Sequence, residues 1–234
     1  MSDEHYESRC ENCIIRELNT LRALKKEELK DISDHKTTRS VKKGETLFFE
    51  GERLNGVFCV RKGVSKLSKR SENGKDQIIK LATKGNVMGQ IAVITQETAD
   101  LTAVALDDME VCFIPKNHIE QGLANNPDFT NAVLKKMTSD LKEADHTIVS
   151  MAQKTVKQRL AATLLTLEET FGVDEDGYIG MTISRADISN IIGTATELCI
   201  RTLASFKKED YISTSGKKIK LEDKVALQHL VEGY

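Results

Sequence analysis

Near the C-terminus of the chain, a group of polar side chains has the types and spacing needed to read a base sequence. Ser184 can cap a short helix, Gly193 ends it, and Thr194 can cap a second helix. That second helix presents Glu197 and Arg201, four residues apart, on one face. Glutamate accepts a hydrogen bond from cytosine, and arginine forms paired hydrogen bonds with guanine. Two short helices joined by a glycine turn predict a helix-turn-helix whose second helix enters the major groove of DNA.

A basic hairpin follows this pair of helices. Two runs rich in β-forming residues, Tyr211–Ser213 and Lys218–Leu221, flank Thr214–Lys217 and predict a wing. Residues 199–221 hold six Lys and Arg against two acids, although the whole chain has 34 Lys+Arg, 36 Asp+Glu and a net charge of -2. A solvated charge run, or a simple ion pair on the second helix, is the alternative interpretation. Because the charge coincides with the helix-turn-helix, the pattern favours phosphate binding.

A long helix with a heptad pattern is predicted upstream of these elements. From Pro127 the helical period takes over, and a sustained 3.5-residue apolar repeat is typical of left-handed pairing between helices. Packing of this helix on its own domain is the alternative. The length and regularity of the seam favour a symmetric dimer. The seam residues are Leu134, Met137, Leu141, Ala144, Ile148 and Met151.

Short β-rich runs separated by glycines occupy much of the first half of the chain. Half of the 14 glycines fall between Gly44 and Gly89, and Asn73-Gly74 is the strongest hairpin signal. Short helical periodicity precedes them over residues 14–33. Many short strands with frequent turns predict a small antiparallel barrel or roll. The predicted strands are Thr46–Phe49, Gly56–Val60, Val64–Leu67, Gln77–Ala82, Thr102–Ala105 and Glu110–Ile114.

Composition places the chain among globular proteins. It has 234 residues, 39% of them hydrophobic and 30% charged, which fits one or two domains with a sizeable core. No run reaches the roughly 18–20 apolar residues of a spanning helix, and the acidic, polar N-terminus is unlike a signal peptide. We therefore expect a cytoplasmic protein with no membrane partner. Its five cysteines are not expected to form a disulfide framework.

With these features, the chain resembles the CRP/FNR family of bacterial transcription regulators over residues 14–225. In the first half, the similarity rests on Lys43–Phe48, Gly51, Gly63, Asn73-Gly74, Gly85 and Gly89. In the second half, it rests on Ile183–Ile188, Gly193, Thr196-Glu197, Arg201 and Ile212–Lys217. It implies an α+β fold with an N-terminal cyclic-nucleotide-binding-type β-roll, a long central dimerisation helix and a C-terminal winged helix-turn-helix. The expected boundaries are 1–33 for an N-terminal segment with short helices, 34–126 for the β-roll sensor domain, 127–152 for the dimerisation helix and 153–234 for the DNA-binding domain.

The resemblance also implies a homodimer bound to double-stranded DNA with an inverted repeat, and RNA polymerase as a further partner. By this similarity Arg185 and Lys217 hold phosphates, while Glu197 and Arg201 read a TGA-like core in each half-site. Thr196 stands where cyclic-AMP-binding members have Arg, and Ile200 stands where FNR-type members often have Ser. The bases recognised outside the core are therefore left open. The expected DNA-binding residues are Ser184, Arg185, Thr194, Thr196, Glu197, Ile200, Arg201 and Lys217.

In the roll, the cyclic-nucleotide site of the family is not retained. Cyclic-AMP-binding members hold their ligand with a Gly-Glu pair and, further along the chain, an Arg that neutralises the phosphate. Here Gln90 follows Gly89, and Asp100, before Leu101, stands where the Arg should be. A carboxylate facing a phosphate is repulsive, with no cation to offset the cost of desolvation. We therefore predict a vestigial pocket at these four residues, no cyclic AMP, and an effector still to be identified.

The cysteines offer a different sensor chemistry. Cys10 and Cys13 form a Cys-x-x-Cys pair, and Cys112 aligns with a cluster ligand of FNR-type oxygen sensors, which implies an iron–sulfur cluster. Such a cluster takes four thiolates as a rule, so the fourth ligand is left open. Cys59 or His5 could stand in, although neither lies at the family spacing. The alternatives are another metal or thiol-redox role, or no metal, with Cys59 and Cys112 packed in strands and Cys10 and Cys13 on a mobile N-terminus.

The sequence favours a regulator over an enzyme. It contains no Walker-type phosphate loop, no His-Glu-x-x-His and no nucleophile elbow. The predicted function is a dimeric, sequence-specific transcription regulator. Iron–sulfur-dependent sensing of oxygen or nitric oxide is one alternative, and a ligand-independent regulator with a scaffold roll is another.

Overall fold

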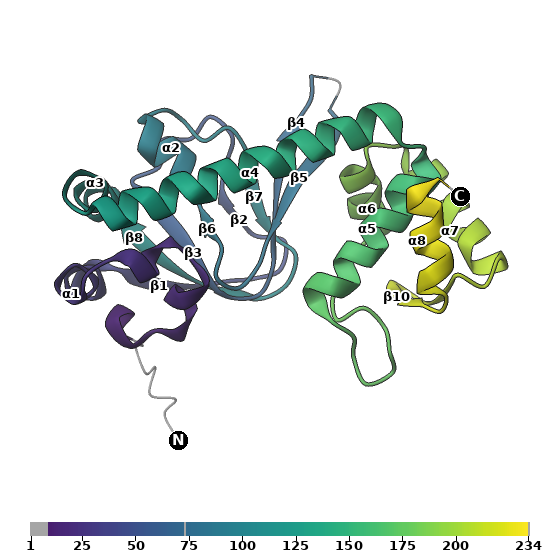
Figure 1. The fold of residues 1–234 in the computed structure, drawn as a ribbon, viewed down its shortest axis with the longest axis horizontal. Helices are drawn as coiled ribbons and strands as arrows, with labels where there is room; N and C mark the ends of the chain where they lie inside the picture. Colours follow the sequence, from purple (N-terminus) through teal and green to yellow (C-terminus); the bar gives the residue numbers. More distant parts are fainter. Residues whose placement is uncertain (1–8, 73, 234) are drawn as a thin grey trace. The chain divides into compact units, whose positions relative to one another are not determined.

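The computed structural model describes residues 9–72 and 74–233, so position 73 of the predicted Asn73-Gly74 turn lies outside the described residues. The described chain forms two compact units. The first comprises the chain up to Lys69 together with Ile79–Leu141, and the second comprises Arg70–Ile78 together with the chain from Lys142 onward. Figure 1 shows most of the strands in the first unit and mostly helices in the second.

Short helices open the first unit, as the periodicity of residues 14–33 predicts. The last of them, α1, buries Leu29 and Ile32, which lie three residues apart on one face of the helix. The earlier three are short 3-10 helices. Their bounds are Cys10–Asn12 (η1), Ile14–Leu18 (η2), Thr20–Ala23 (η3) and Lys26–His35 (α1).

Two antiparallel four-stranded sheets form the predicted roll. The strand order is β1-β8-β3-β6 in one sheet and β2-β7-β4-β5 in the other. The turn from β3 to β4 needs Gly63, because its φ is +86° and an added Cβ would lie 2.8 Å from the Asp108 carbonyl oxygen. All six predicted strands are present, and β1 and β6 are additional. The bounds are Thr37–Val41 (β1), Thr46–Phe48 (β2), Gly56–Lys62 (β3), Ser65–Arg70 (β4), Asp76–Ala82 (β5), Val87–Met88 (β6), Thr102–Ala105 (β7) and Met109–Pro115 (β8).

The central strands β3 and β8 are buried on both faces. In β3, Val57 and Cys59 pack in a core with the N-terminal helices, whereas Phe58 and Val60 pack inside the roll. Strand β8 alternates in the same way, so that Cys112 shares the first of these cores. Successive side chains of a strand point to opposite faces, which explains the division. One face of this strand pair therefore packs against the N-terminal segment.

Three further helices follow in the chain: α2 (Gln90–Thr95), α3 (Lys116–Asn125) and α4 (Pro127–Gln153). At the start of α4 the side-chain oxygen of Asn126 accepts hydrogen bonds from the N–H groups of Asp128 and Phe129, both at 3.1 Å. Among the described residues, every helix is too short or too polar to cross a membrane.

The second unit is a small helical domain with a two-stranded hairpin, as predicted. Helix α5 begins after Thr155, which forms a capping box with Gln158, and Leu160 and Leu164 on its inner face are fully buried. The final helix, α8, was not identified from the sequence. The bounds are Val156–Phe171 (α5), Arg185–Ile192 (α6), Thr196–Lys208 (α7), Ile212–Ser215 (β9), Lys218–Leu221 (β10) and Lys224–Glu232 (α8).

Candidate nucleic-acid interface and effector sites

The first helix of the predicted helix-turn-helix, α6, starts at the residue expected to cap it. The Ser184 hydroxyl accepts the N–H of Asp187 at 3.0 Å and donates in turn to the Asp187 carboxylate. Ile188 and Ile192 are buried beneath the helix. The cap and the apolar face together set the direction of α6 in the domain.

Gly193 makes the turn between α6 and α7. Its φ of 63° and ψ of 51° are left-handed, and the next N–H, of Thr194, donates to the Ser189 carbonyl at 3.1 Å. The Ser189 hydroxyl also bonds the Thr196 hydroxyl at 3.0 Å, which links the two helices. The prediction that Thr194 caps α7 is wrong, because Ala195 occupies the cap without a side-chain hydrogen bond. Thr194 lies within the turn, where its backbone N–H ends the preceding helix.

Helix α7 has one buried and one exposed face. The exposed side chains at its start are Glu197, Leu198, Ile200 and Arg201. In the described chain Glu197 and Arg201 form no ion pair with each other, so the simple surface ion pair is not what holds them. Their polar ends are therefore available to base edges. The buried face consists of Cys199, Thr202, Leu203 and Phe206.

Arg185 connects the start of α6 to the tip of the wing. Its guanidinium donates to the carbonyl oxygens of Gly216 at 3.2 Å and Lys217 at 3.4 Å. Partial burial lowers the pKa of Arg185. The Lys217 side chain is exposed at the turn between β9 and β10. Arg185 thus positions the wing, a contact that the residue types alone did not indicate.

Ion pairs compensate part of the basic charge counted in the sequence. The Lys218 ammonium lies 2.7 Å from the Asp174 carboxylate and 5.6 Å from the centre of the Tyr178 ring. This contact raises the pKa of Lys218 and lowers the pKa of Asp174. Arg201 and Lys217, by contrast, are exposed, and both belong to the set of residues expected to contact DNA.

Arg159 of α5 is a positioning residue that the sequence analysis missed. Its Nε donates to the Ile192 carbonyl at 2.8 Å, and its Nη1 donates to the carbonyls of Met151 at 3.4 Å and Lys154 at 2.6 Å. These oxygens lie at the ends of α6 and α4, where carbonyls have no partner within their own helix. One guanidinium therefore joins the end of α4 to the helix-turn-helix. Nothing in its spacing distinguishes it from a surface arginine.

The predicted dimer seam contains a row of exposed apolar residues on α4. Leu141 is 62% exposed and Ile148 is 66% exposed in the single protomer. Met137 and Met151 are half-buried, and Met137 packs against the core of the first unit. Large apolar side chains repeated along one face of a helix mark an interaction surface. The exposed members are Leu134, Leu141, Ala144 and Ile148.

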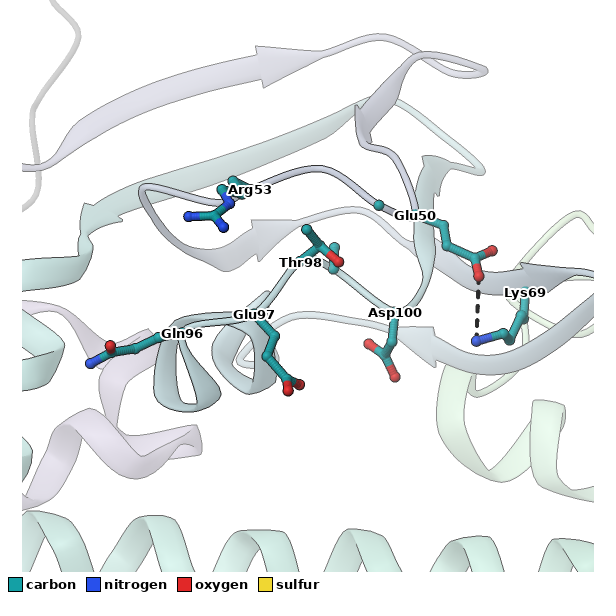
Figure 2. A pocket seen from close by; sticks show the side chains of 9 residues that line it. Glu50, Arg53, Lys69, Gln96, Glu97, Thr98 and Asp100 are labelled. Atoms are coloured by element: carbon teal, nitrogen blue, oxygen red, sulfur yellow. Dashed lines mark ion pairs between the residues drawn. The ribbon is translucent and has the colours of Figure 1, made fainter.

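The predicted ligand-pocket residues are only partly brought together. An open pocket of about 620 Å³ lies between the segment after β2 and the segment before β7, and Asp100 lines it (Figure 2). Gly89 instead precedes α2 with a φ of 81°, and Gln90 is the first residue of that helix. Leu101 packs partly buried against the core of the roll.

The lining of this pocket is more acidic than basic. Glu50, Glu97 and Asp100 contribute carboxylates, against the cations of Arg53 and Lys69. The Lys69 ammonium lies 3.3 Å from the Glu50 carboxylate, so one of the two cations is already paired (Figure 2). In the same view the carboxylates of Glu97 and Asp100 point to the same side. A phosphate placed there would be repelled by them.

The three cysteines predicted as metal ligands meet in one core. Cys10 and Cys112 are buried there, and Cys13 packs against it. Cys59 belongs to the same core and lies directly opposite Cys112 in the β3–β8 pair. All four are free thiols. His5, the other candidate for a fourth ligand, lies outside the described residues.

The Cys-x-x-Cys segment is anchored on α1, so the idea of a mobile segment is wrong for Cys10. The Cys10 N–H donates to the Ser33 hydroxyl at 2.6 Å, and that hydroxyl donates to the Glu11 carboxylate at 2.9 Å. The Arg9 guanidinium donates to the same carboxylate at 2.6 Å. The hydrogen bond from Arg9 is the largest cause that lowers the pKa of Glu11, to about 2.

Three buried thiols, two in the first unit and one in the second, have raised pKa values. Burial, with added contributions from Cys112, Cys13 and Cys10, raises the pKa of Cys59 to about 12. Burial also raises the pKa of Cys112. In the second unit, burial raises the pKa of Cys199 to about 11.

A further group of titratable side chains, not identified from the sequence, lies between α1 and α3. The Nδ1 atom of the buried His118 is 2.9 Å from the Asp31 carboxylate, and the Nδ1 of His35 is 3.4 Å from it. The two imidazole rings are 5.0 Å apart. One ligand atom from each residue lies within 4.8 Å of the others, a spacing that could hold a metal ion. The carboxylate already bridges both rings, and it thereby ties α1 to α3.

Two family models match the chain in succession. The cyclic nucleotide-binding domain matches residues 38–126, and the Crp-like helix-turn-helix domain matches residues 158–230. The fumarate and nitrate reduction regulatory protein of Escherichia coli is 28% identical over 228 residues, which cover 94% of this chain and 89% of that protein. The transcriptional activator protein Anr of Pseudomonas protegens is 26% identical over 98% of this chain and 95% of its own length.

Several solved structures have the same fold. FixK2 from Bradyrhizobium japonicum has a TM-score of 0.75 and 23% identity, over 83% of this chain and 96% of that chain. A CRP/FNR-family transcriptional regulator from Eubacterium rectale has a TM-score of 0.76 and 20% identity, over 91% and 97%. At these identities the structures show a shared fold.

Proposed function

This chain belongs to the CRP/FNR family of transcription regulators, and we propose that it binds an inverted-repeat DNA site as a homodimer. The observation that carries the proposal is the exposed start of α7, where Glu197, Ile200 and Arg201 stand on the outside of a buried helix face. A helix presented in this way enters the major groove and reads base edges with its first turns.

Each charged residue of the expected DNA-binding set has a definite role in this proposal. Arg201 forms paired hydrogen bonds with a guanine, and Glu197 accepts one from a cytosine amino group, within a TGA-like core. Lys217, at the wing tip, and Arg185, at the start of α6, hold phosphates. The groups that flank the base-reading pair are Ser184, Thr194, Thr196 and Ile200.

Selection from random duplex DNA, followed by gel-shift measurements on single-base variants, tests this assignment. We expect Arg201→Ala to lose about 1–3 kcal/mol of discrimination at one base pair per half-site. Lys207→Ala removes an equal charge from the same helix and serves as the control, with the base preference retained. If Arg201→Ala keeps the full preference of the unsubstituted protein, the assignment fails.

We also propose that the two protomers pair through the α4 seam, and that RNA polymerase is a partner of the DNA-bound dimer in the cytoplasm. The exposed Leu134, Leu141 and Ile148 support the pairing. A glutamate at Ile148 would place buried charges opposite each other, so we expect monomers and loss of DNA binding at concentrations where the wild type is dimeric. Ser139→Glu, on the opposite side of the helix, is the control. Analytical ultracentrifugation distinguishes the two, and a dimeric Ile148→Glu protein would contradict the proposal.

The effector is, in our proposal, not a cyclic nucleotide. The acidic lining of the pocket supports this view, since Asp100 and Glu97 present carboxylates where an anionic ligand would need cations. Calorimetric titration with cyclic AMP and cyclic GMP tests it, and we expect no measurable heat of binding. Saturable binding of either nucleotide would overturn this part of the proposal.

A second candidate function, iron–sulfur-dependent sensing, is favoured by one specific observation. Cys10 shares a single core with Cys112, which is distant in the sequence, and Cys13 packs against that core. Thiolates are the usual ligands of iron–sulfur clusters, so this donor set fits such a group. Anaerobic purification with iron and acid-labile sulfide assays tests the idea. Iron and sulfide that are lost in air would support an oxygen or nitric oxide sensor, whereas metal-free protein would exclude it.

A further inference from the structure

The first sheet places a fourth thiol beside the three cysteines that the family spacing identifies. Cys59 of β3 and Cys112 of β8 are directly opposite each other in the antiparallel pair. Opposite residues in such a pair have Cβ atoms roughly 4.5–5.5 Å apart on the same face of the sheet. The two strand thiols are therefore neighbours, and both face the core that contains the N-terminal segment.

The N-terminal segment closes over this pair of thiols. Cys10 and Cys59 are 7% and 5% exposed in the same core, and Cys13 packs against it. The Asn19 side chain, a few residues further along the segment, donates a hydrogen bond to the Cys59 sulfur at 3.5 Å. Four of the five cysteines in the chain thus converge on one place.

We propose that Cys59 is the fourth thiolate of an iron–sulfur centre completed by Cys10, Cys13 and Cys112, an inference that rests on the second candidate function above. No cysteine occurs between Cys13 and Cys59 in the sequence, so the N-terminal segment has none to offer. The strand supplies it because the alternation of β3 turns Cys59 toward that segment. The chain therefore reaches the usual count of four thiolates by a different route.

The spacing of the sulfurs favours a cluster over a single metal ion. A tetrahedral zinc site with four thiolates needs sulfurs roughly 3.8 Å apart, given zinc–sulfur bonds of about 2.3 Å. Among the described residues, no three cysteine sulfurs lie within 4.8 Å of one another. A cluster would spread its four thiolates over more than one iron and would therefore accept larger distances between the sulfurs. The hydrogen bonds from Asn19 to Cys59, at 3.5 Å, and between Thr38 and Cys112, at 3.9 Å, are contacts of the kind that adjust the potential of such a centre.

The test compares anaerobically purified full-length proteins by iron content, acid-labile sulfide and absorption spectrum. Cys59→Val keeps the volume and the apolar character of the side chain in a buried strand, and Cys59→Ser is a second variant with a different packing consequence. Cys199→Ala removes a buried thiol from the other unit and is the matched control. Thermal unfolding of the metal-free proteins shows whether each variant retains its fold.

We expect both Cys59 variants to contain at least about tenfold less iron and sulfide than the wild type. Cys199→Ala should retain the wild-type content of both. A loaded wild type together with a fully loaded Cys59→Val protein would overturn the role of Cys59 and leave the iron–sulfur function standing. A wild type with neither iron nor sulfide after anaerobic reconstitution would remove that function itself. Zinc in place of iron and sulfide, or a Cys59–Cys112 disulfide in protein kept free of oxygen, would also overturn the proposal.

Discussion

Cys59 and Cys199 are both buried thiols with raised pKa values, but their surroundings differ in kind. Cys199 sits on the inner face of α7 with Leu203 and Phe206, and burial is what raises its pKa. Around Cys59, three more thiols add to the effect of burial. The first cysteine fills space, whereas the second belongs to a set of potential ligands.

The same contrast holds for the two units as a whole. In the second unit, the buried face of α7 fixes the position of the helix. The exposed Glu197 and Arg201 on its other face are the residues that we propose contact DNA. In the first unit the proposed metal ligands lie inside, where the N–H of Cys10 donates to the Ser33 hydroxyl of α1. A surface site can be formed by one short stretch of sequence, whereas an interior site needs several segments to be folded together.

The largest expected effect separates the two kinds of buried thiol. Cys112→Val should lower the iron content of anaerobically purified protein at least about tenfold, because it removes a ligand from the interior set. The same substitution leaves the helix-turn-helix unit unchanged, so non-specific DNA binding at low salt is the internal control. Retention of full iron content would show that Cys112 is as inert as Cys199.

A smaller loss is expected from the arginine that positions the DNA-binding unit. Arg159→Ala removes hydrogen bonds to three carbonyls at the ends of α4 and α6 and should destabilise the protein by about 2 kcal/mol. Urea unfolding followed by circular dichroism measures the change. Arg159→Lys keeps the charge but not the planar fork of donors, so its stability should lie between that of the wild type and that of Arg159→Ala. Equal stability of all three proteins would mean that the contact is dispensable.

The turn of the helix-turn-helix gives an effect of about 1–2 kcal/mol. Gly193 has a φ of +63°, and an added Cβ would lie 3.1 Å from the Met151 sulfur, so Gly193→Ala adds a close contact to backbone strain. Gly216 has a φ of +57° with nothing within 4 Å of an added Cβ, so Gly216→Ala isolates the strain. The difference between their unfolding free energies measures the contact. If Gly193→Ala is no worse than Gly216→Ala, the contact contributes nothing.

The smallest effect concerns the anchor of the Cys10 segment and depends on pH. The pKa of Glu11 falls from 4.5 to about 2 in the folded protein, so its contribution to stability is complete above about pH 4.5 and is lost as the pH falls toward 2. Glu11→Gln should therefore be less stable than wild type at pH 7, with a difference that shrinks below pH 4.5. Unfolding curves of both proteins across this range provide the measurement. A difference that does not change with pH would contradict the assignment.

The helix-turn-helix, its capping Ser184 and the six strands of the roll were predictable because they depend on local signals. Caps, glycine turns and apolar periods act over a few residues. The same local reasoning failed at Thr194, where hydroxyl capping was expected. The end of the preceding helix decided that position, because the Ser189 carbonyl accepts the Thr194 N–H and the Ser189 hydroxyl bonds the Thr196 hydroxyl.

By itself, the amino-acid sequence determined the order of the elements, the pair Glu197 and Arg201 that we propose reads bases, and the apolar seam from Leu134 to Met151. Only the tertiary structure placed Arg159 on the ends of two helices and Cys59 among the other thiols. The physical reason is the same in both cases. The partners of a buried guanidinium or thiol come from other segments of the chain. Strand register and helix packing bring these segments together, and local sequence signals do not specify such contacts.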